Sequence, residues 1–379
     1  MDKARTAKTS RRTFLNRSIA AAAAVGAAGA IGSGNVFSQA PAAPTSGLQP
    51  VANLGGEKIV QVSMVVKDIQ KVSKRFSDVF GPSWEFYDLK PKQVVLHGKE
   101  LPDGNCYLKL ALGNCGGRSF KLVQPVSGQS SYMEFLEKQG EGLYSIGFGS
   151  LAAHDQIVAA LKNVGVGVEM QGDLGDNSRF TILETAEDLG CRVEFASPPH
   201  RGVETNIQQT GSFVPDRPSL VNMDRPVFPG GKRFNQYGIV VKDGKKSSKR
   251  FEELLGIGGW NFSNTNSIET SWYEKPVPDR PSGHLIGMTW VGDMQLELIT
   301  PKWPGPHQAF LDKHGNGIQH LSMGRQTDYD NVVNALKDAG FKREFGSTLV
   351  SPSGNSVVSY MALEDQLGGF VLEIANKKE

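Results

Sequence analysis

The sequence predicts an α+β fold built from tandem βαβββ modules, and the main observation behind this is an internal repeat. The segment QVSMVVKDIQKVSKRFSDVFGPSWEF begins at Gln61, and QYGIVVKDGKKSSKRFEELLGIGGWNF begins 175 residues later at Gln236. FLEKQGEGLYSIGF from Phe135 and FLDKHGNGIQHLSM from Phe310 are separated by the same 175 residues. Landmarks that keep their order at a constant offset indicate that one half of the chain duplicates the other.

Each copy divides into two units with the same order of elements. The apolar strand VSMVV or YGIVV runs through Lys-Asp into a helix that carries SKRF and ends at Gly81 or Gly256. Alternating strands follow, LKLAL and FKLVQP in the first copy and IGMTWV and MQLELITP in the second. A second unit begins at GLYSIGF or GIQHLSM, and its helix, DQIVAALKNVG or DNVVNALKDAG, has apolar residues at helical spacing. Two further strands complete it, so we expect four βαβββ units.

Length and charge set the limits of the interpretation. The 379 residues suit two domains, and 41 basic against 39 acidic residues leave a formal charge of +2. This balance gives no reason to expect a nucleic-acid partner. Beyond the N-terminal region, no stretch is long and apolar enough for stable membrane insertion. We expect an N-terminal domain at 58–198, a linker rich in Pro, Gly and charge at 199–232, and a C-terminal domain at 233–377.

The N-terminal region resembles a twin-arginine export signal. Arg11 and Arg12 stand in SRRTFL directly ahead of an apolar, Ala-rich run, and small residues near Ser38 suit cleavage. We assign residues 1–40 to the signal and 41–57 to a flexible spacer. The expected partner is the Tat translocon, and the expected location is the periplasm or the medium. An ordinary basic N-terminus or an uncleaved anchor is the alternative interpretation.

The three cysteines leave two interpretations open. Cys106, Cys115 and Cys191 form no CxxC pair, which argues against a thiolate zinc site. In an oxidising compartment, Cys106 and Cys115 either pair across a hairpin, with Cys191 left over, or all three remain buried thiols.

The order of motifs resembles one known superfamily. A strand ending in VVKD, a helix, a Gly and a Trp, followed by FLEKQGEG and a strand, is similar to the vicinal oxygen chelate superfamily. That superfamily includes glyoxalase I, methylmalonyl-CoA epimerase, extradiol dioxygenases and hydroxyphenylpyruvate dioxygenase. The resemblance covers about residues 58–198 and 233–376. It implies two half-open barrels, each made of two modules, with a divalent ion inside a cup. Each cup then closes within one chain, so either a monomer or a homodimer is expected.

The resemblance also implies a set of metal ligands in the second copy: Gln236, Glu297, His320 and Glu373. One amide, one imidazole and two carboxylates suit one divalent ion of Zn, Ni, Co, Mn or Fe(II). Strand alternation supports the two carboxylates, because Glu297 in MQLELITP and Glu373 in FVLEI each point away from their apolar neighbours. A carboxylate in such a place is costly without a cation. For Gln236, the alternative is an amide bonded to the backbone.

The first copy provides an internal contrast. The equivalent positions hold Gln61, Lys121, Ser145 and Glu194. A lysine and a serine replace a carboxylate and the imidazole, so we expect no metal in this half. Lys121 is expected either to pair with Glu194 or to lean into solvent.

Further residues are candidates for contact with a small-molecule substrate: Tyr273, Arg280 and His284. Tyr273 and Arg280 belong to an insertion expected to overhang the metal cup, and His284 precedes a strand at its edge. We expect His307 and His314 to be turn or surface residues.

The chemistry of the superfamily implies proton abstraction next to a chelated carbonyl or hydroxyl, as in an isomerase, epimerase or lyase. Glu373 is the expected base, and Glu297 the alternative. An Fe(II)-dependent dioxygenase is the competing interpretation, although Gln236 stands where its first histidine belongs. A metal-free small-molecule binding protein is the third. Outside the cytoplasm, a small oxygen-rich substrate is more plausible than a glutathione or CoA derivative.

Overall fold

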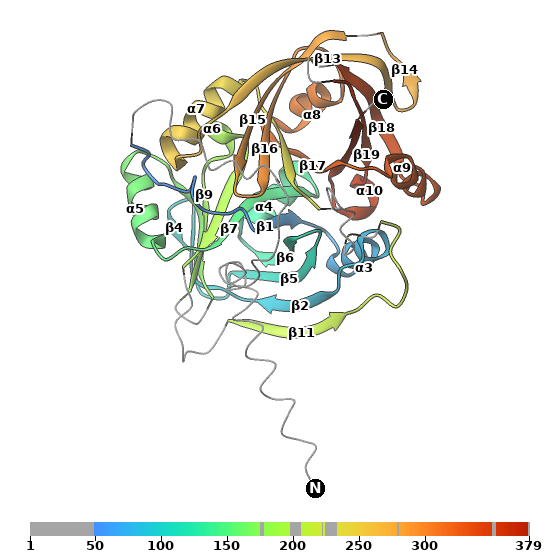
Figure 1. The fold of residues 1–379 in the computed structure, drawn as a ribbon. Helices are drawn as coiled ribbons and strands as arrows, with labels where there is room; N and C mark the ends of the chain where they lie inside the picture. The colour runs from blue at the N-terminus through green and yellow to red at the C-terminus, as the bar shows by residue number, and fades with distance from the viewer. Residues whose placement is uncertain are drawn as a thin grey trace, which may run out of the picture.

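The computed structural model describes residues 49–174, 178–197, 206–221, 223, 233–278, 280–350 and 354–377 (Figure 1). The expected signal at 1–40 lies outside these residues. In the part that is described, no helix is both long enough and apolar enough to cross a bilayer.

The N-terminal half forms one curled sheet with its helices. The strands are β1 (Gln61–Val65), β2 (Trp84–Leu89), β3 (Lys92–Leu96), β4 (Lys99–Glu100), β5 (Cys106–Cys115), β6 (Arg118–Gly128), β7 (Gly142–Ser150), β8 (Val168–Asp173), β9 (Arg179–Leu183), β10 (Arg192–Ala196) and β11 (Ile207–Phe213). The helices are α3 (Ile69–Phe80), α4 (Ser131–Gln139), α5 (His154–Asn163) and α6 (Ala186–Leu189). The order across the sheet is β11-β2-β5-β6-β1-β7-β10-β9-β8-β3-β4.

The C-terminal half repeats this plan. Its strands are β12 (Gln236–Val240), β13 (Asn261–Trp272), β14 (Lys275–Pro276), β15 (Arg280–Val291), β16 (Met294–Pro301), β17 (Gly317–Arg325), β18 (Lys342–Val350), β19 (Ser356–Ala362) and β20 (Val371–Lys377). Its helices are α7 (Gly244–Leu255), α8 (Pro306–His314), α9 (Tyr329–Asp338) and α10 (Glu364–Leu367). The order is β14-β13-β15-β16-β12-β17-β20-β19-β18.

This topology confirms the α+β fold of tandem βαβββ modules. In every module the first and last strands pair in parallel: β1 with β6, β7 with β10, β12 with β16, and β17 with β20. Within each half, the two modules join through their first strands, which are antiparallel. The central strands of each sheet therefore come from the starts and ends of the modules, where the expected site residues lie.

The Lys-Asp motif of both copies begins a helix for a local reason. Asp68 and Asp243 are N-caps whose side chains each accept a hydrogen bond from the backbone N–H three residues later, at 3.0 Å. Gly81 and Gly256 end the same helices with φ of 89° and 68°. Only glycine adopts this left-handed conformation without strain.

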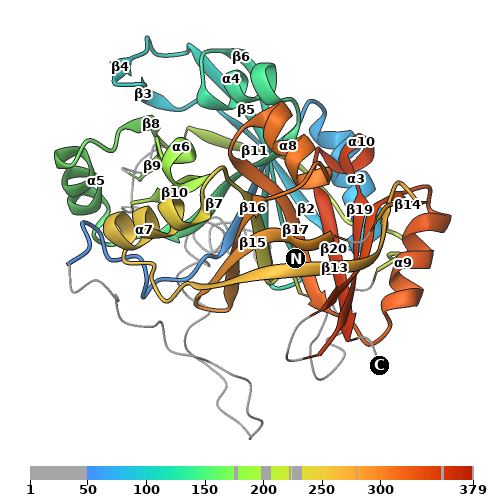
Figure 2. The ribbon, with the colours of Figure 1, turned by 90° about the horizontal axis from the view of Figure 1, so that it is seen from above.

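The two halves differ in closure. The long strand β13 pairs with β15 through its first part and with β18 through its second, so the C-terminal sheet closes into a barrel (Figure 2). In the N-terminal half, β2 pairs with β5 and β3 with β8, but the chain between β2 and β3 is not a strand. Pro91 stands in this break, and a proline has no N–H to donate to a neighbouring strand. The C-terminal barrel is thus more closed than the half-open form expected.

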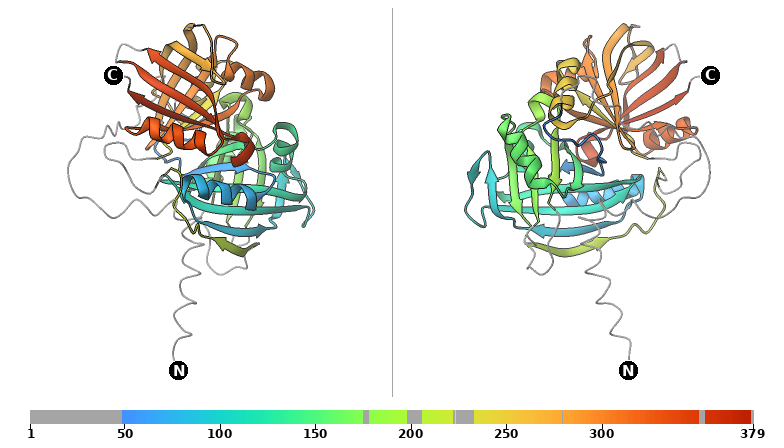
Figure 3. Two further views of the ribbon diagram at one scale, coloured as in Figure 1. Left: turned by 90° about the vertical axis from the view of Figure 1, so that its right-hand side faces the viewer. Right: turned by 60° about the vertical axis from the view of Figure 1, so that its left-hand side comes forward.

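The halves pack about a pseudo-twofold axis. Arg118 donates to Asp293 Oδ1 at 2.9 Å, and Gln139 donates to the His314 carbonyl at 3.1 Å; both pairs are 175 residues apart. Equivalent positions of the two copies therefore touch each other. Helix α3 lies beside α10, and α6 beside α7 (Figures 1 and 3). One of the three hydrophobic clusters in the described residues contains side chains of both halves.

Parts of the expected spacer and of the expected linker make specific contacts with the folded halves. Within the expected spacer 41–57, Leu54 is buried and its N–H donates to the Leu255 carbonyl at 2.8 Å. Within the expected linker 199–232, Ile207–Phe213 forms β11, which extends the N-terminal sheet along β2 (Figure 3, right). Both segments lack clear periodicity, so the sequence did not predict these contacts.

None of the three cysteines, all of which lie in the described residues, forms a disulfide, and all three are buried. The suggested Cys106–Cys115 pairing across a hairpin is wrong, because the two residues are the first and last of the same strand, β5. An extended strand of this length holds its ends far beyond disulfide distance. The alternative, three buried thiols, is what the structure contains.

We expect Arg118→Met to destabilise the fold. The guanidinium is 5% exposed and donates to the carbonyls of Ile59, Phe234 and Asp293 as well as to the Asp293 carboxylate. Its loss leaves these acceptors without a donor and should lower the free energy of unfolding by about 2–4 kcal/mol.

Urea unfolding followed by circular dichroism measures this change. The matched control is Arg217→Met, since Arg217 pairs with Asp78 but is exposed at the surface. Its unfolding midpoint should stay close to that of the wild type. Equal midpoints for the two variants would contradict the role given to Arg118.

Candidate metal centre

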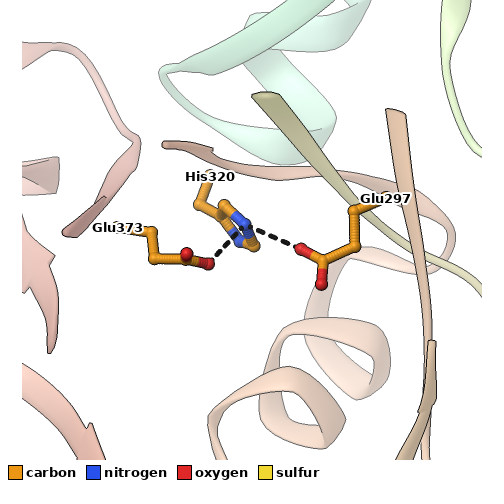
Figure 4. A group of neighbouring side chains, drawn as sticks. All are labelled: Glu297, His320 and Glu373. Atoms are coloured by element: carbon orange, nitrogen blue, oxygen red, sulfur yellow. Dashed lines mark ion pairs between the residues drawn. The ribbon is translucent and has the colours of Figure 1, made fainter. Parts of the chain in front are cut away.

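Three of the four expected ligands converge inside the C-terminal barrel (Figure 4). Glu297 comes from β16, His320 from β17 and Glu373 from β20. Their exposed fractions are 4%, 0% and 9%. Nε2 of His320 lies 3.3 Å from Oε2 of Glu297 and 3.3 Å from Oε2 of Glu373. One ligand atom from each residue lies within 4.8 Å of the other two.

Gly238 makes room for this arrangement. It lies on β12, which separates β16 from β17, and its register partners are Glu297 and His320. A Cβ atom built on Gly238 would lie 1.9 Å from Cε1 and 2.2 Å from Nε2 of His320. The imidazole therefore occupies the space that any larger residue would fill, which fixes the position of its ring.

Neighbouring polar side chains orient the histidine and one carboxylate. Nδ1–H of His320 donates to Oε1 of Gln319 at 2.8 Å, which leaves Nε2 directed toward the carboxylates. Glu373 accepts from Ser322 Oγ at 3.2 Å and from the Tyr360 hydroxyl at 2.8 Å. These contacts fix the orientation of the imidazole ring of His320 and of both carboxylate oxygens of Glu373.

Burial and mutual charge shift the pKa values of all three groups. Burial alone would lower the pKa of His320, but the two carboxylates beside it raise the pKa to about 9. Burial raises the pKa of Glu297. Burial would raise the pKa of Glu373 too, but His320 and the hydrogen bonds from Tyr360 and Ser322 bring it below the usual value.

The donor set fits a divalent cation. Oε2 of Glu297 and Nε2 of His320 are buried, and apart from the 3.3 Å contacts within the cluster neither has a hydrogen-bond partner among the described residues. Buried polar atoms are rarely left in this state. An imidazole nitrogen with two carboxylate oxygens suits Mn, Fe(II), Co, Ni or Zn.

The fourth expected ligand, Gln236, has another partner. It is buried on β12, but its Nε2 donates to Oε1 of Gln295 at 2.6 Å. Its register partners are Gln295 and Ser322, whereas Gly238 is the residue level with Glu297 and His320. A ligand role for Gln236 stays a prediction.

The expectation that His307 is a turn or surface residue is wrong. Pro306 begins α8, and a proline suits the first position of a helix, so PGPH starts a helix instead of forming an open turn. His307 is 3% exposed, and its ring lies 5.4 Å from that of Tyr360 and 6.3 Å from that of His320. The sequence of this short segment contained no pattern that would predict a position for His307 beside the metal cluster. His314, in contrast, is partly exposed at the end of α8.

His284 connects to the cluster through His307. It lies within β15, is 4% exposed, and its Nε2 is 3.0 Å from Nδ1 of His307. Burial lowers the pKa of His284 to about 4, so the imidazole is neutral at physiological pH. The pair extends the polar lining of the barrel from the carboxylates to β15.

Two other substrate candidates are not brought to the cluster. Tyr273 is 47% exposed at the turn between β13 and β14 and has a φ of 47°. Arg280 is the first residue of β15, and its side chain is outside the described part of the chain. The insertion expected to overhang the cup is mostly the closing strand β13. Substrate contacts by these residues remain predictions.

The equivalent position in the N-terminal half holds an ion pair, the first of the two alternatives expected for Lys121. Its ammonium group contacts Oε1 of Glu194, and both residues are buried. Oε2 of Glu194 accepts from Ser63 at 3.0 Å and from Ser145 at 2.8 Å. A fixed cation of the protein itself thus balances the carboxylate that matches Glu373.

Solved structures show which fold the chain shares. A variant of 4-hydroxymandelate synthase from Streptomyces coelicolor is 13% identical, with a TM-score of 0.54 over 85% of this chain and 93% of that one. A Mn(II)-bound glyoxalase from Novosphingobium aromaticivorans is 14% identical, covering 86% and 83%, with a TM-score of 0.43. Methylmalonyl-CoA epimerase from Mycobacterium tuberculosis is 18% identical, covering 38% and 87%, with a TM-score of 0.27. Only the first of these three is similar enough overall to establish a shared fold.

Residues 235–350 match the family model of the Glyoxalase/Bleomycin resistance protein/Dioxygenase superfamily. This segment contains Glu297 and His320 and ends before Glu373. No curated protein matches the sequence significantly. The family match is thus confined to the C-terminal half, and the likeness to 4-hydroxymandelate synthase shows that the fold is shared over most of the chain.

Proposed function

We propose that the C-terminal barrel holds one divalent metal ion and abstracts a proton next to a carbonyl or hydroxyl of a small oxygen-rich substrate, as an isomerase, epimerase or lyase. The observation that carries this is the buried convergence of Glu297, His320 and Glu373 within 4.8 Å. A divalent ion bound there acts as a Lewis acid toward two neighbouring substrate oxygens. Gln236 is the proposed fourth ligand.

Glu297 is better suited than Glu373 to accept the substrate proton. Glu373 receives hydrogen bonds from Ser322 and Tyr360 on both of its oxygens, which favours its charged form and lowers its basicity. Oε2 of Glu297 has no such donor among the described residues. We therefore reverse the expected order, with Glu297 as the base and Glu373 as the anchored ligand.

His307 is a candidate for holding a substrate oxygen. Its Nδ1 faces His284, while its Nε2 is buried and without a hydrogen-bond partner in the described structure. Burial and the nearby His284 and His320 lower the pKa of His307, so it would act as a neutral imidazole. A neutral imidazole with one committed nitrogen offers the other for one hydrogen bond to substrate.

A dioxygenase is the second candidate, because the chain shares its fold with 4-hydroxymandelate synthase. The donor set favours the first proposal, since non-haem iron oxygenases use two histidines and one carboxylate, whereas this cluster has one histidine and two carboxylates. A metal-free binding protein is the third candidate. Export through the twin-arginine pathway, proposed from the leader, favours small substrates over glutathione or CoA derivatives.

The metal content of the purified protein tests the ligand assignment. The purified protein, loaded with Mn(II) or Zn(II) and desalted, should retain about one ion per chain, and His320→Ala and Glu373→Ala should lose it or bind it at least tenfold more weakly. Elemental analysis measures this. The matched control is Ser145→Ala, at the position equivalent to His320 in the other half. Equal retention of the ion in all four proteins would contradict the ligand assignment, and absence of metal from all four would favour the metal-free binding protein.

The metal affinity should depend on pH. Because the pKa of His320 is raised to about 9, its imidazole is protonated at pH 7, and metal binding must displace that proton. The metal affinity should therefore rise about tenfold per pH unit from pH 7 and level off above the pKa. Calorimetric titration with Zn(II) in buffers of different ionisation enthalpy measures the proton released. An affinity independent of pH between 7 and 9 would contradict this account.

Hydrogen exchange of a substrate C–H group tests the proposed reaction. Metal-loaded protein in D₂O should exchange the C–H hydrogens of small α-hydroxy carbonyl compounds such as dihydroxyacetone, followed by proton NMR. Glu297→Gln should lower the exchange rate at least about 100-fold, since it removes the general base. The metal content of each sample separates loss of the base from loss of the ion. Oxygen consumption with catechol, without hydrogen exchange, would instead support the dioxygenase.

A further inference from the structure

The N-terminal half contains a pocket that the metal-dependent reaction does not use. The empty space at this pocket amounts to about 830 Å³, a volume that includes solvent at its open mouth. Most of its lining is apolar and comes from β2, β5, β9, β11 and the segment after β8: Leu89, Leu108, Leu110, Leu174, Phe180 and Ile207. A concave, mainly apolar pocket with a few polar groups is typical of a small-molecule site.

The polar part of this pocket corresponds to the metal cup of the other half. Lys121 and Glu194 line the pocket, and they stand where Glu297 and Glu373 stand in the C-terminal barrel. Tyr132, at the start of α4, lines the pocket beside them. The exposed fractions of these three residues are 8%, 6% and 2%. Duplication has therefore produced a second cup in which a protein ammonium group replaces a metal ion.

In this cup the acceptors already have partners, and the groups left to bind a ligand are hydrogen-bond donors. Both oxygens of Glu194 already accept, from Lys121 on one side and from Ser63 and Ser145 on the other. Lys121 uses two of its three N–H groups, on Glu194 and on the Tyr132 hydroxyl at 3.2 Å. The Tyr132 hydroxyl accepts from Lys121, and its own proton has no acceptor among the described residues. One N–H and one O–H therefore remain for a ligand.

The charge of the cup selects against an anionic ligand. Lys121 and Glu194 neutralise each other, so a bound carboxylate would leave one uncompensated negative charge among buried groups. Burying an unpaired charge costs far more than burying a neutral carbonyl that receives hydrogen bonds.

We propose that the N-terminal pocket binds a neutral, largely apolar small molecule whose single carbonyl oxygen accepts hydrogen bonds from Tyr132 and Lys121. The leucine-rich walls hold the apolar body, and the ion pair with its tyrosine holds the oxygen. This site is independent of the metal centre and does not require the reaction proposed for it.

The test uses two neutral fluorescent probes. One is the naphthyl ketone 6-propionyl-2-dimethylaminonaphthalene, and the other is N-phenyl-1-naphthylamine, which has no carbonyl. The full-length mature protein should bind the ketone saturably, with one site per chain and a blue-shifted emission. 2-Acetylnaphthalene should displace the ketone, and 2-naphthoate should not.

Three pocket variants locate the site, and a fourth, at the metal centre, is the control. Leu110→Trp fills the pocket and should abolish saturable binding of the ketone, and Leu89→Trp does the same from another wall. Tyr132→Phe keeps the ring but removes the O–H, so the dissociation constant of the ketone should rise roughly three- to tenfold, with that of the amine unchanged. His320→Ala should leave ketone binding intact, which separates this proposal from the metal site.

Three results would overturn the proposal. They are absence of saturable ketone binding, ketone binding that survives a folded Leu110→Trp or Leu89→Trp variant, and equal ketone affinity in Tyr132→Phe and wild type. Circular dichroism checks that each variant is folded, and Tyr132→Phe stays decisive if both tryptophan variants fail to fold.

Discussion

The candidate centre depends on one steric constraint, the contact between the imidazole of His320 and the backbone of Gly238. A glycine on the strand between β16 and β17 leaves room for the ring inside the barrel, where Nε2 lies 3.3 Å from both Glu297 and Glu373. The equivalent residue in the other half is Ser63, whose hydroxyl bonds to Glu194. The half with the glycine therefore holds an imidazole at this position, and the half with the serine holds a network of hydroxyl groups.

The two cups solve the same electrostatic problem in different ways. Each buries a carboxylate at the same place on the last strand of the half, Glu194 or Glu373, and each surrounds it with hydroxyl donors. In the N-terminal cup the compensating charge is the ammonium group of Lys121. In the C-terminal cup a second carboxylate increases the negative charge, and the raised pKa of His320 is the response of the protein to that excess. Of the two cups, the C-terminal one therefore has the donor set that suits an external cation.

The sequence predicted those features that depend on local pattern and repetition. The offset of 175 residues identified the modules, Lys-Asp marked the helix starts, and strand alternation placed Glu297 and Glu373 on one side. Features that depend on distant strands were missed. The polar stretch NFSNTNSIETSW has no pattern that predicts a strand closing a barrel. The neighbours of Gly238 depend on the register between strands, which the local sequence does not specify. His307 was missed because a three-residue Pro-Gly-Pro segment reads as a turn.

The contact between Arg118 and Asp293 bears on the history of the chain. In a symmetric dimer of two identical half-length chains, a residue on the twofold axis meets its own copy. Arginine would face arginine there, or aspartate would face aspartate, and like charges repel. An ion pair at such a position becomes available only after duplication, when the two copies can mutate separately. The charge difference at the axis is thus a mark of divergence between the two copies, and it favours the pairing of two unlike halves over the pairing of two identical ones.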